Sequence, residues 1–311
     1  MTQTASSPRI VSLIASATEI VHALGAGSTQ VGRSHECDWP AAVLALPPLT
    51  RAKFKVEGSS RDIDDRVKAL VQDGLAVYEV DAARLRALAP DVILTQDQCE
   101  VCAVSLADVE RAVCSWTDHA ANVVSLRPHT MDDVMSDIRR VADAIRRPED
   151  GVRLTTEMRA RLAALRDLTG GRPKPRLAFI EWIEPAMSGG HWMPELVDAA
   201  GGTNLFGETG ANSPWIAWED VAAADPDVIL VAPCGYDLAV TRREMAALDG
   251  HPIWNSLRAV RAGEVYLADG NAFFNRPGPR LVESAEILAE IFHPDVASFG
   301  HRGTSFERFY I

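Results

Sequence analysis

The most constraining feature of the chain is a strand-like sequence, Pro-Asp-Val-Ile-Leu, that occurs twice, at residues 90–94 and 226–230. Each copy follows a short amphipathic helical segment, and its apolar run after proline is typical of a buried strand. The first copy passes into a polar loop and then, from Ser105, into a helical pattern. This order places the loop at the carboxyl end of a sheet, where open α/β folds bind ligands. The repeat therefore predicts two similar α/β halves.

Strand-like and helical segments alternate in both halves, which favours parallel sheets covered by helices. A chain of 311 residues can form two domains with separate cores. We predict an α/β fold with two similar lobes, residues 1–128 and 173–311, each with a parallel-sheet core and with a ligand cleft between them. Residues 129–172 carry two helical patterns separated by Pro148 and are expected to connect the lobes. Residues 293–311 show little periodicity and are expected to form a tail.

Charge and hydropathy exclude two classes of protein. The net charge of −12 argues against nucleic acid as a partner, because phosphate binding needs a basic surface. No apolar run is long enough to cross a membrane. The N-terminal residues lack the basic, apolar and small-residue regions of an export signal. We therefore expect a cytoplasmic monomer that is not embedded in a membrane; with a native signal peptide ahead of Met1, the expectation would become periplasmic.

The chain has an odd number of cysteines, which does not suit a disulfide framework. They are Cys37, Cys99, Cys102, Cys114 and Cys234. Cys99 and Cys102 have CxxC spacing in the loop after the first repeat strand, and three interpretations stay open. The two thiols pack the strand–helix junction, ligate zinc or iron, or form a redox pair. The candidate metal ligands are His35, Cys37, Cys99 and Cys102.

Aromatic side chains concentrate in or beside the loops expected at strand ends. They are Trp39, Trp182, Trp192, Trp215, Trp218, Phe273 and Phe274. A single tryptophan usually belongs to a core, because its burial removes a large apolar area from water. Their common location instead favours a site for a large, flat organic ligand. His35 and His191 lie in these loops as ligand candidates or as ordinary polar residues. No Ser-His-Asp elbow, P-loop or HExxH motif is present.

The sequence resembles the substrate-binding proteins of ABC transporters of the cobalamin and ferric-siderophore uptake type, over about residues 8–292. Besides the two repeat strands, the resemblance rests on Arg9-Ile-Val-Ser-Leu13 with Ala17-Thr18-Glu19, Asp38-Trp39-Pro40, Ser188-Gly-Gly190, Ala200-Gly-Gly-Thr-Asn-Leu-Phe206 and Pro279-Arg280. It implies two α/β lobes joined by one long helix, with limited closure on binding. The segments His35–Asp38 and Cys99–Cys102 look like the signature of a cobalamin-binding-like subgroup.

In cobalamin-binding members of this family, aromatic side chains from both lobes hold the corrin. The resemblance implies similar roles for the strand-end loops of this chain. The predicted ligand-binding residues of the first half are His35, Glu36, Cys37, Asp38, Trp39, Gln96, Asp97 and Cys99. Those of the second half are Glu181, Trp182, His191, Trp192, Trp215, Phe273, Phe274 and Arg276.

The resemblance also bears on the partner. In exported relatives one surface glutamate per lobe docks on arginines of an ABC permease. Glu219 lies at the second-lobe position, whereas Ala83, beside Arg84, lies at the first-lobe position. A single docking glutamate weakens a two-point attachment to a permease.

We therefore expect a non-enzymatic binding protein for a corrinoid (cobalamin or a precursor or analogue) or a similar metal-bearing macrocycle. A second hypothesis is a metal-binding or thiol-active protein or enzyme that uses the four candidate metal ligands on the same fold. A third is a ferric-siderophore or metal-ion receptor. The third is disfavoured because the loops hold few basic residues beyond Arg33, Arg51 and Arg276.

Overall fold

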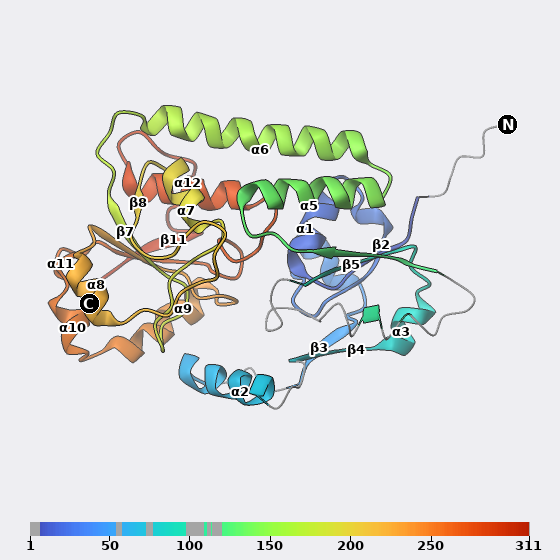
Figure 1. The fold of residues 1–311 in the computed structure, drawn as a ribbon, viewed down its shortest axis with the longest axis horizontal. Helices are drawn as coiled ribbons and strands as arrows, with labels where there is room; N and C mark the ends of the chain where they lie inside the picture. The colour runs from blue at the N-terminus through green and yellow to red at the C-terminus, as the bar shows by residue number, and fades with distance from the viewer. Residues whose placement is uncertain are drawn as a thin grey trace. The chain divides into compact units, whose positions relative to one another are not determined.

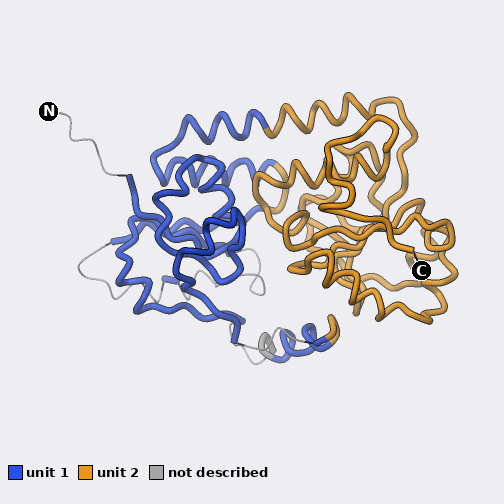
Figure 2. Tube along the Cα trace, turned by 180° about the vertical axis from the view of Figure 1, so that it is seen from behind, with its two compact units in different colours: residues 1–58, 62–128, 132–157 blue, residues 59–61, 129–131, 158–311 orange. Residues whose placement is uncertain are grey.

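The computed structural model describes residues 7–53, 58–72, 77–97, 109–110, 113 and 120–310. The chain divides into two compact units (Figure 2). Unit 1 comprises residues 1–58, 62–128 and 132–157, and unit 2 comprises residues 59–61, 129–131 and 158–311. The CxxC pair, Cys99 and Cys102, lies outside the described residues, as does most of the helix expected from Ser105 on.

Unit 1 is built on a four-stranded parallel sheet with strand order β2-β1-β5-β6. Its strands are β1 (Ile10–Ser12), β2 (Gln30–Arg33), β5 (Val92–Gln96) and β6 (Asn122–Leu126) (Figure 1). The first repeat strand is β5, which is buried at all five positions and paired on both sides. Its continuous apolar run therefore reflects a central strand covered on both faces. A separate antiparallel pair joins β3 (Thr50–Ala52) to β4 (Tyr78–Val80).

The helices of unit 1 follow the apolar spacing of the sequence. They are α1 (Ala15–Ala23), α2 (Ser60–Gln72), α3 (Ala82–Ala87) and α5 (Met131–Ala144), with short 3-10 turns η1 (Gly27–Thr29) and η2 (Ala41–Ala45). Units 1 and 2 divide α2 after Arg61 and α5 after Met131. The stripe Val134, Ile138 and Val141 on α5 is fully buried, as its helical period predicts. The Asp81 carboxylate caps α3 by accepting a hydrogen bond from the Arg84 N–H at 2.9 Å.

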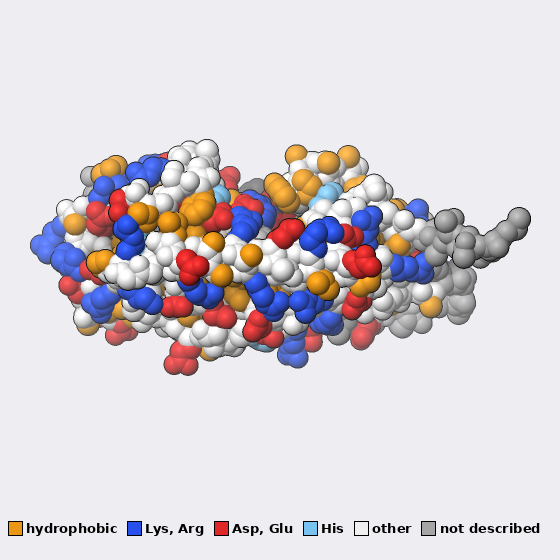
Figure 3. Space-filling view, turned by 90° about the horizontal axis from the view of Figure 1, so that it is seen from above, with side chains coloured by type: hydrophobic (Ala, Val, Ile, Leu, Met, Phe, Trp, Pro, Cys, Tyr) orange, Lys and Arg blue, Asp and Glu red, His pale blue; other side chains and the backbone are white. Residues whose placement is uncertain are grey.

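Helix α6 (Pro148–Thr169) is shared: residues 148–157 belong to unit 1 and residues 158–169 to unit 2. In its second part Met158, Leu162 and Leu165 are buried, which agrees with their predicted common face. Figure 3 shows that acidic and basic side chains are mixed over the face on which α6 lies. This face therefore has no single-sign patch that would suit a polyanionic partner.

Unit 2 has a five-stranded sheet with order β11-β10-β9-β7-β8, parallel except for the β10–β11 pair. Its strands are β7 (Arg176–Ile180), β8 (Thr203–Asn204), β9 (Val228–Val231), β10 (Val265–Ala268) and β11 (Phe306–Phe309). Its helices are α7 (Met193–Ala199), α8 (Trp218–Ala224), α9 (Leu238–Glu244), α10 (Pro252–Ser256), α11 (Arg258–Arg261) and α12 (Leu281–Phe292), with the 3-10 turn η3 (Met245–Leu248). The second repeat strand is β9, again a buried strand paired on both sides.

The aspartate of the repeated sequence has the same role in both units. In unit 1 the Asp91 carboxylate accepts a hydrogen bond from the backbone N–H of Arg9, just ahead of β1, at 2.7 Å. In unit 2 Asp227 accepts one from the N–H of Arg176, the first residue of β7, at 2.9 Å. This backbone hydrogen bond lowers the pKa of Asp227, with the Arg258 guanidinium acting in the same direction. The repeat therefore encodes a central strand together with the anchor for its neighbour.

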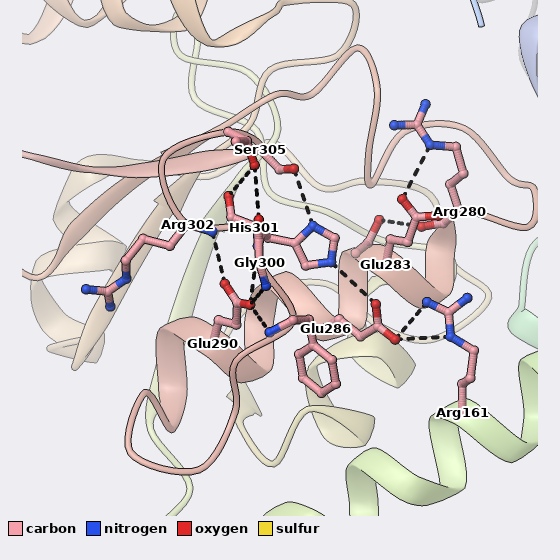
Figure 4. A network of polar contacts seen from close by, with 12 residues as sticks. Arg161, Arg280, Glu283, Glu286, Glu290, Gly300, His301, Arg302 and Ser305 are labelled. Atoms are coloured by element: carbon pink, nitrogen blue, oxygen red, sulfur yellow. Dashed lines mark hydrogen bonds and ion pairs between the residues drawn. The ribbon is translucent and has the colours of Figure 1, made fainter. Parts of the chain in front are cut away.

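The residues after α12 are held to that helix by a buried carboxylate (Figure 4). Glu290 accepts hydrogen bonds from four consecutive backbone N–H groups, those of Phe299, Gly300 (2.7 Å), His301 (3.3 Å) and Arg302 (3.0 Å). The chain then forms β11, which pairs antiparallel with β10. The segment expected as an aperiodic tail thus completes the sheet. The position of this segment depends on the Glu290 side chain of α12. Hydrophobic periodicity within the segment cannot reveal that contact.

A second carboxylate of α12, Glu286, makes the stability of unit 2 depend on pH. Burial acts to raise its pKa, but hydrogen bonds from His301 (3.4 Å) and Arg161 (2.7 Å) outweigh burial and lower the pKa below its ordinary value of 4.5. A lowered carboxyl pKa stabilises the fold at pH above 4.5, and this contribution is lost as the pH falls through the folded pKa. We expect Glu286→Gln to flatten the acid side of the stability profile.

The measurement is the urea midpoint of the unit 2 transition between neutral and acid pH. Glu283→Gln is the matched control, because Glu283 lies on the same helix and is paired with Arg280 only at 3.7 Å. An equally steep acid decline in Glu286→Gln and in the wild type would contradict this assignment.

Candidate ligand-binding site

The loop that follows β2 holds His35 in a fixed position in unit 1. The Thr50 hydroxyl contacts both the backbone N–H of His35, at 3.0 Å, and its ring Nδ1, at 2.7 Å. The ring also packs against Tyr78, with centroids 5.1 Å apart. The Tyr78 hydroxyl donates a hydrogen bond to Glu36 at 2.7 Å, which braces the next residue of the loop. Strands β3 and β4 thus supply the groups that orient His35.

The environment of His35 suits a neutral imidazole. Burial lowers the pKa of His35, and the nearby positive charge of Arg33 lowers it further. Since Nδ1 is engaged with Thr50, the nitrogen left to contact a ligand is Nε2, to which no described residue hydrogen bonds. A neutral ring oriented through one nitrogen is the usual arrangement of a histidine that coordinates a metal through the other.

The Cys37 thiol lies in the interior of unit 1. Its sulfur accepts a hydrogen bond from the Thr18 hydroxyl at 3.0 Å, and the side chain packs with Ala15 and Val43. Within the described ranges no group of three or more His, Cys, Asp or Glu side chains could hold a metal ion. Because Cys99 and Cys102 lie outside those ranges, the four-residue metal site stays a prediction.

Trp39 is the exposed aromatic residue of this loop. Its side chain is 44% exposed, and a cis peptide bond joins it to Pro40, directly ahead of η2. Asp38 beside it is half-buried. At the end of β5, Gln96 is buried, whereas Asp97 is exposed and lies 3.9 Å from the Arg127 guanidinium.

Unit 2 presents its own exposed tryptophan, Trp215, on a rigid backbone. Met187 forms isolated β-bridges with both Trp182 and Trp215. On either side of Trp215, the Ser188 N–H donates to the Pro214 carbonyl at 2.9 Å, and the Ile216 N–H donates to the Ala186 carbonyl at 3.0 Å. The Trp215 side chain is nevertheless 54% exposed. The loop after β7 therefore holds this indole in solvent at a defined place.

Glu181 and Trp182, at the end of β7, take part in two further contacts. The Glu181 carboxylate accepts a hydrogen bond from the Ser213 hydroxyl at 2.9 Å, and that hydroxyl accepts one from the Gly190 N–H at 3.1 Å. Trp182 packs against Tyr236 with ring centroids 5.2 Å apart. These contacts join the loop that follows β7 to the segments that follow β8 and β9.

Tyr236 is a site residue that the sequence did not single out. Its hydroxyl and the Trp182 indole N–H are enclosed, and neither has a hydrogen-bond partner among the described residues. Burial raises the pKa of Tyr236 to about 12, so the phenol keeps its proton at neutral pH. Tyr236 lies two residues after Cys234, in the loop that follows the second repeat strand. That position alone could have identified it as a candidate site residue. The pair adds two donors to the strand-end loops of unit 2.

Three predicted aromatic residues instead pack inside unit 2. The Trp192 indole donates a hydrogen bond to the Phe274 carbonyl at 2.8 Å, and Phe274 packs against Phe179 at a centroid distance of 5.4 Å. The Arg280 guanidinium lies over the Phe273 ring, with its Cζ atom 4.4 Å from the ring centroid. Trp192, Phe273 and Phe274 are all buried. They support the loop of residues 269–276.

The remaining predicted residues are placed as follows. Arg276 is buried and donates a hydrogen bond to the Asn271 side chain at 2.8 Å. His191 is half-buried, has φ of 50°, and has its pKa lowered by burial and by the neighbouring His129. Glu219 is exposed in the first turn of α8, and Ala83 is exposed on α3. The docking role of Glu219 stays a prediction.

Comparisons with known proteins match this architecture. The family model described as "Periplasmic binding protein" matches residues 10–272. The vitamin B12-binding protein of Vibrio cholerae serotype O1 is 23% identical over 284 residues, which cover 89% of this chain and 86% of that protein. A crystal structure of a periplasmic heme-binding protein from Pseudomonas aeruginosa superposes with a TM-score of 0.70 at 21% identity, covering 94% of each chain.

The crystal structure of the periplasmic vitamin B12-binding protein of Vibrio cholerae gives a TM-score of 0.63 at 22% identity, covering 92% of this chain and 96% of that one. These likenesses confirm the two-lobed α/β fold. Within the described residues no helix combines the length and the apolar character needed to span a membrane. Since the family model covers most of the sequence, the chain belongs to the periplasmic binding protein family of substrate-binding proteins.

Proposed function

We propose that the protein binds a corrinoid, either cobalamin or one of its precursors or analogues, through the strand-end loops that carry Trp39 and Trp215. The observation that carries the proposal is that these two indoles stay 44% and 54% exposed although their loops are ordered. A large aromatic surface gains free energy when a flat, apolar ligand covers it. Binding, not catalysis, is what this family's name describes.

His35 is proposed to supply a nitrogen ligand to the metal at the centre of the macrocycle. The support is geometric, since Thr50 holds Nδ1 and orients the ring while Nε2 remains for the ligand. The lowered pKa of His35 keeps the ring neutral at neutral pH, as coordination requires. Because Cys37 packs against Thr18, we assign it no contact with the macrocycle.

Heme is the second candidate ligand. The related proteins include vitamin B12-binding and heme-binding members, and both ligands are metal-bearing macrocycles with flat faces. The exposed indoles could cover the flat face of either macrocycle, and an imidazole nitrogen could coordinate the metal of either. Corrinoid is preferred because relatives matched by sequence, those of Vibrio cholerae and Pectobacterium carotovorum among them, are vitamin B12-binding proteins that align with 89% of this chain. Transfer of the ligand to an ABC permease, with Glu219 as a docking contact, is proposed on the same family resemblance.

The test is an absorbance titration of the full-length protein with aquocobalamin, cobinamide and hemin. We expect saturable shifts of the corrin bands with a dissociation constant in the micromolar range or below. His35→Ala should retain binding through the tryptophans but lose the band shift that nitrogen coordination causes. A shift with hemin alone would replace corrinoid by heme. No shift with any of the three at tens of micromolar would refute the proposal.

A further inference from the structure

Two histidines face one another in unit 2, and one of them, His191, is among the predicted ligand-binding residues. His129 is the first residue of the segment 129–131, and His191 ends the loop ahead of α7. Their Nδ1 atoms lie 3.4 Å apart, with ring centroids 5.3 Å apart and ring planes inclined by 41°. Both side chains are half-buried, so solvent reaches the pair.

The separation of the two nitrogens is informative. Hydrogen bonds from N–H groups in proteins have their most common donor–acceptor distance at about 2.9–3.0 Å, so a direct hydrogen bond between these rings would be long. Two imidazole nitrogens bound to one tetrahedral zinc ion at about 2.0–2.1 Å lie about 3.3–3.4 Å apart. In an octahedral site with the same bond lengths, adjacent ligands would lie only about 2.9 Å apart. The pair therefore has the spacing of two tetrahedral ligands.

The backbone fixes His191 by contacts that do not involve His129. Its N–H donates to the Ala211 carbonyl at 2.7 Å, and its carbonyl accepts from the Gly210 N–H at 3.0 Å. These bonds hold it at φ of 50°, a left-handed conformation that is uncommon for a residue with a side chain. Gly190 permits this approach, since a Cβ there would lie 2.5 Å from the Ala211 carbonyl oxygen. Such conformations concentrate at functional sites.

Two further contacts hold the surroundings of the pair. The Met131 N–H, two residues after His129, donates to the Glu195 carboxylate on α7 at 2.8 Å. Trp192 stacks on the His191 ring with an interplanar angle of 26° and a centroid distance of 5.5 Å. The rings are thus brought together by their surroundings, an arrangement that preorganises ligands for an ion.

We propose that His129 and His191 form a binding site for a zinc ion, with water at the two remaining tetrahedral positions. In the part of the chain that the structure describes, no third His, Cys, Asp or Glu completes the group, so the described residues supply two of the four ligands. Imidazole is a good ligand for zinc and open positions occupied by water are common in zinc sites. The ion would join the segment 129–131 to the loop ahead of α7.

The test uses Co²⁺ as a spectroscopic substitute for Zn²⁺ on the full-length, metal-free, reduced protein. We expect the strong visible absorption of tetrahedral Co²⁺, without the thiolate charge-transfer band that a cysteine-containing site would add. Zn²⁺ should displace the colour. His129→Gln and His191→Asn should each weaken Co²⁺ binding by more than about tenfold. Asparagine is chosen at 191 because it tolerates the left-handed backbone.

His251→Asn is the matched control, because His251 lies elsewhere in unit 2 and caps α10. It should bind Co²⁺ as the wild type does, and all three variants should keep the wild-type unfolding midpoint in the presence of a chelator. The proposal is overturned if the wild-type protein binds neither ion at millimolar concentration. It is equally overturned if both variants of the pair bind with unchanged affinity, or if the bound Co²⁺ shows thiolate charge transfer.

Discussion

Replacing Trp215 by alanine is expected to weaken corrinoid binding by roughly 30- to 150-fold, which corresponds to about 2–3 kcal/mol. The indole is 54% exposed, so its removal takes little from the fold of unit 2. Its backbone is held by hydrogen bonds of the neighbouring residues Pro214 and Ile216, so the loop keeps its conformation without the ring. The loss would therefore report the contact between ring and ligand. The measurement is the absorbance titration with aquocobalamin and cobinamide.

Trp39→Ala should weaken binding in the same direction, and Trp39→Phe should restore part of the affinity because a smaller ring keeps some of the covered area. Tyr310→Ala is the matched control: Tyr310 is 69% exposed, but it lies just beyond β11 and contacts the Arg308 guanidinium. If Trp215→Ala and Trp39→Ala bind corrinoids as tightly as Tyr310→Ala does, the exposed indoles are not the ligand-binding surface.

Glu290→Ala is expected to destabilise unit 2 by about 3–5 kcal/mol. The carboxylate is 4% exposed and accepts four backbone hydrogen bonds from residues 299–302. Its removal leaves these N–H groups without their acceptor, and the chain leading to β11 loses its anchor. The measurements are the denaturant midpoint of the unit 2 transition and the hydrogen exchange of the amides at 299–302.

Two further variants separate the hydrogen bonds from a general effect of mutating α12. Glu290→Gln keeps one carbonyl oxygen for the N–H groups and should lose about half as much stability. Glu283→Ala, on the same helix, should change stability by less than about 0.5 kcal/mol because its side chain is partly exposed and pairs with Arg280 only at 3.7 Å. Fast exchange at 299–302 in the wild-type protein would show that the anchor is weaker than its geometry implies.

The sequence allowed prediction of those parts of the fold that depend on residues close to one another in the chain. The repeat strands β5 and β9 were predictable because a short apolar run after proline is typical of a buried strand. The α5 stripe of Val134, Ile138 and Val141 follows directly from the helical period. Family resemblance then supplied the pairing of two such halves, which the family model and the solved structures confirm.

Side-chain direction in the strand-end loops was not predictable, because loops have no period. Trp39 and Trp215 are exposed, whereas Trp192 and Phe274 are buried, although all four occur in similar polar surroundings in the sequence. The difference comes from distant partners, such as the Phe274 carbonyl that accepts the Trp192 indole N–H. A thiol such as that of Cys37 is likewise directed by its partner Thr18, nineteen residues earlier in the chain.

Contacts between residues that are distant in the sequence were also not predictable, because they depend on partners outside the local segment. His129 and His191 are separated by 62 positions, and nothing in either segment indicates the other. Tyr236 lies beyond the second repeat strand, but its contact with Trp182 depends on the alignment of β7 with β9. Contacts of this kind depend on the order of strands in the sheet. Local patterns in one sequence do not reveal that order.

The antiparallel strand β11 has a consequence for synthesis of the protein on the ribosome. Strand β10 is paired with β9 on one side and with β11 on the other, and β11 lies 38 residues or more after the end of β10. Until residues 306–309 have left the ribosome, β10 is an unpaired sheet edge that can template wrong pairing with another chain. This edge therefore favours aggregation of the nascent chain until β11 emerges and pairs with β10.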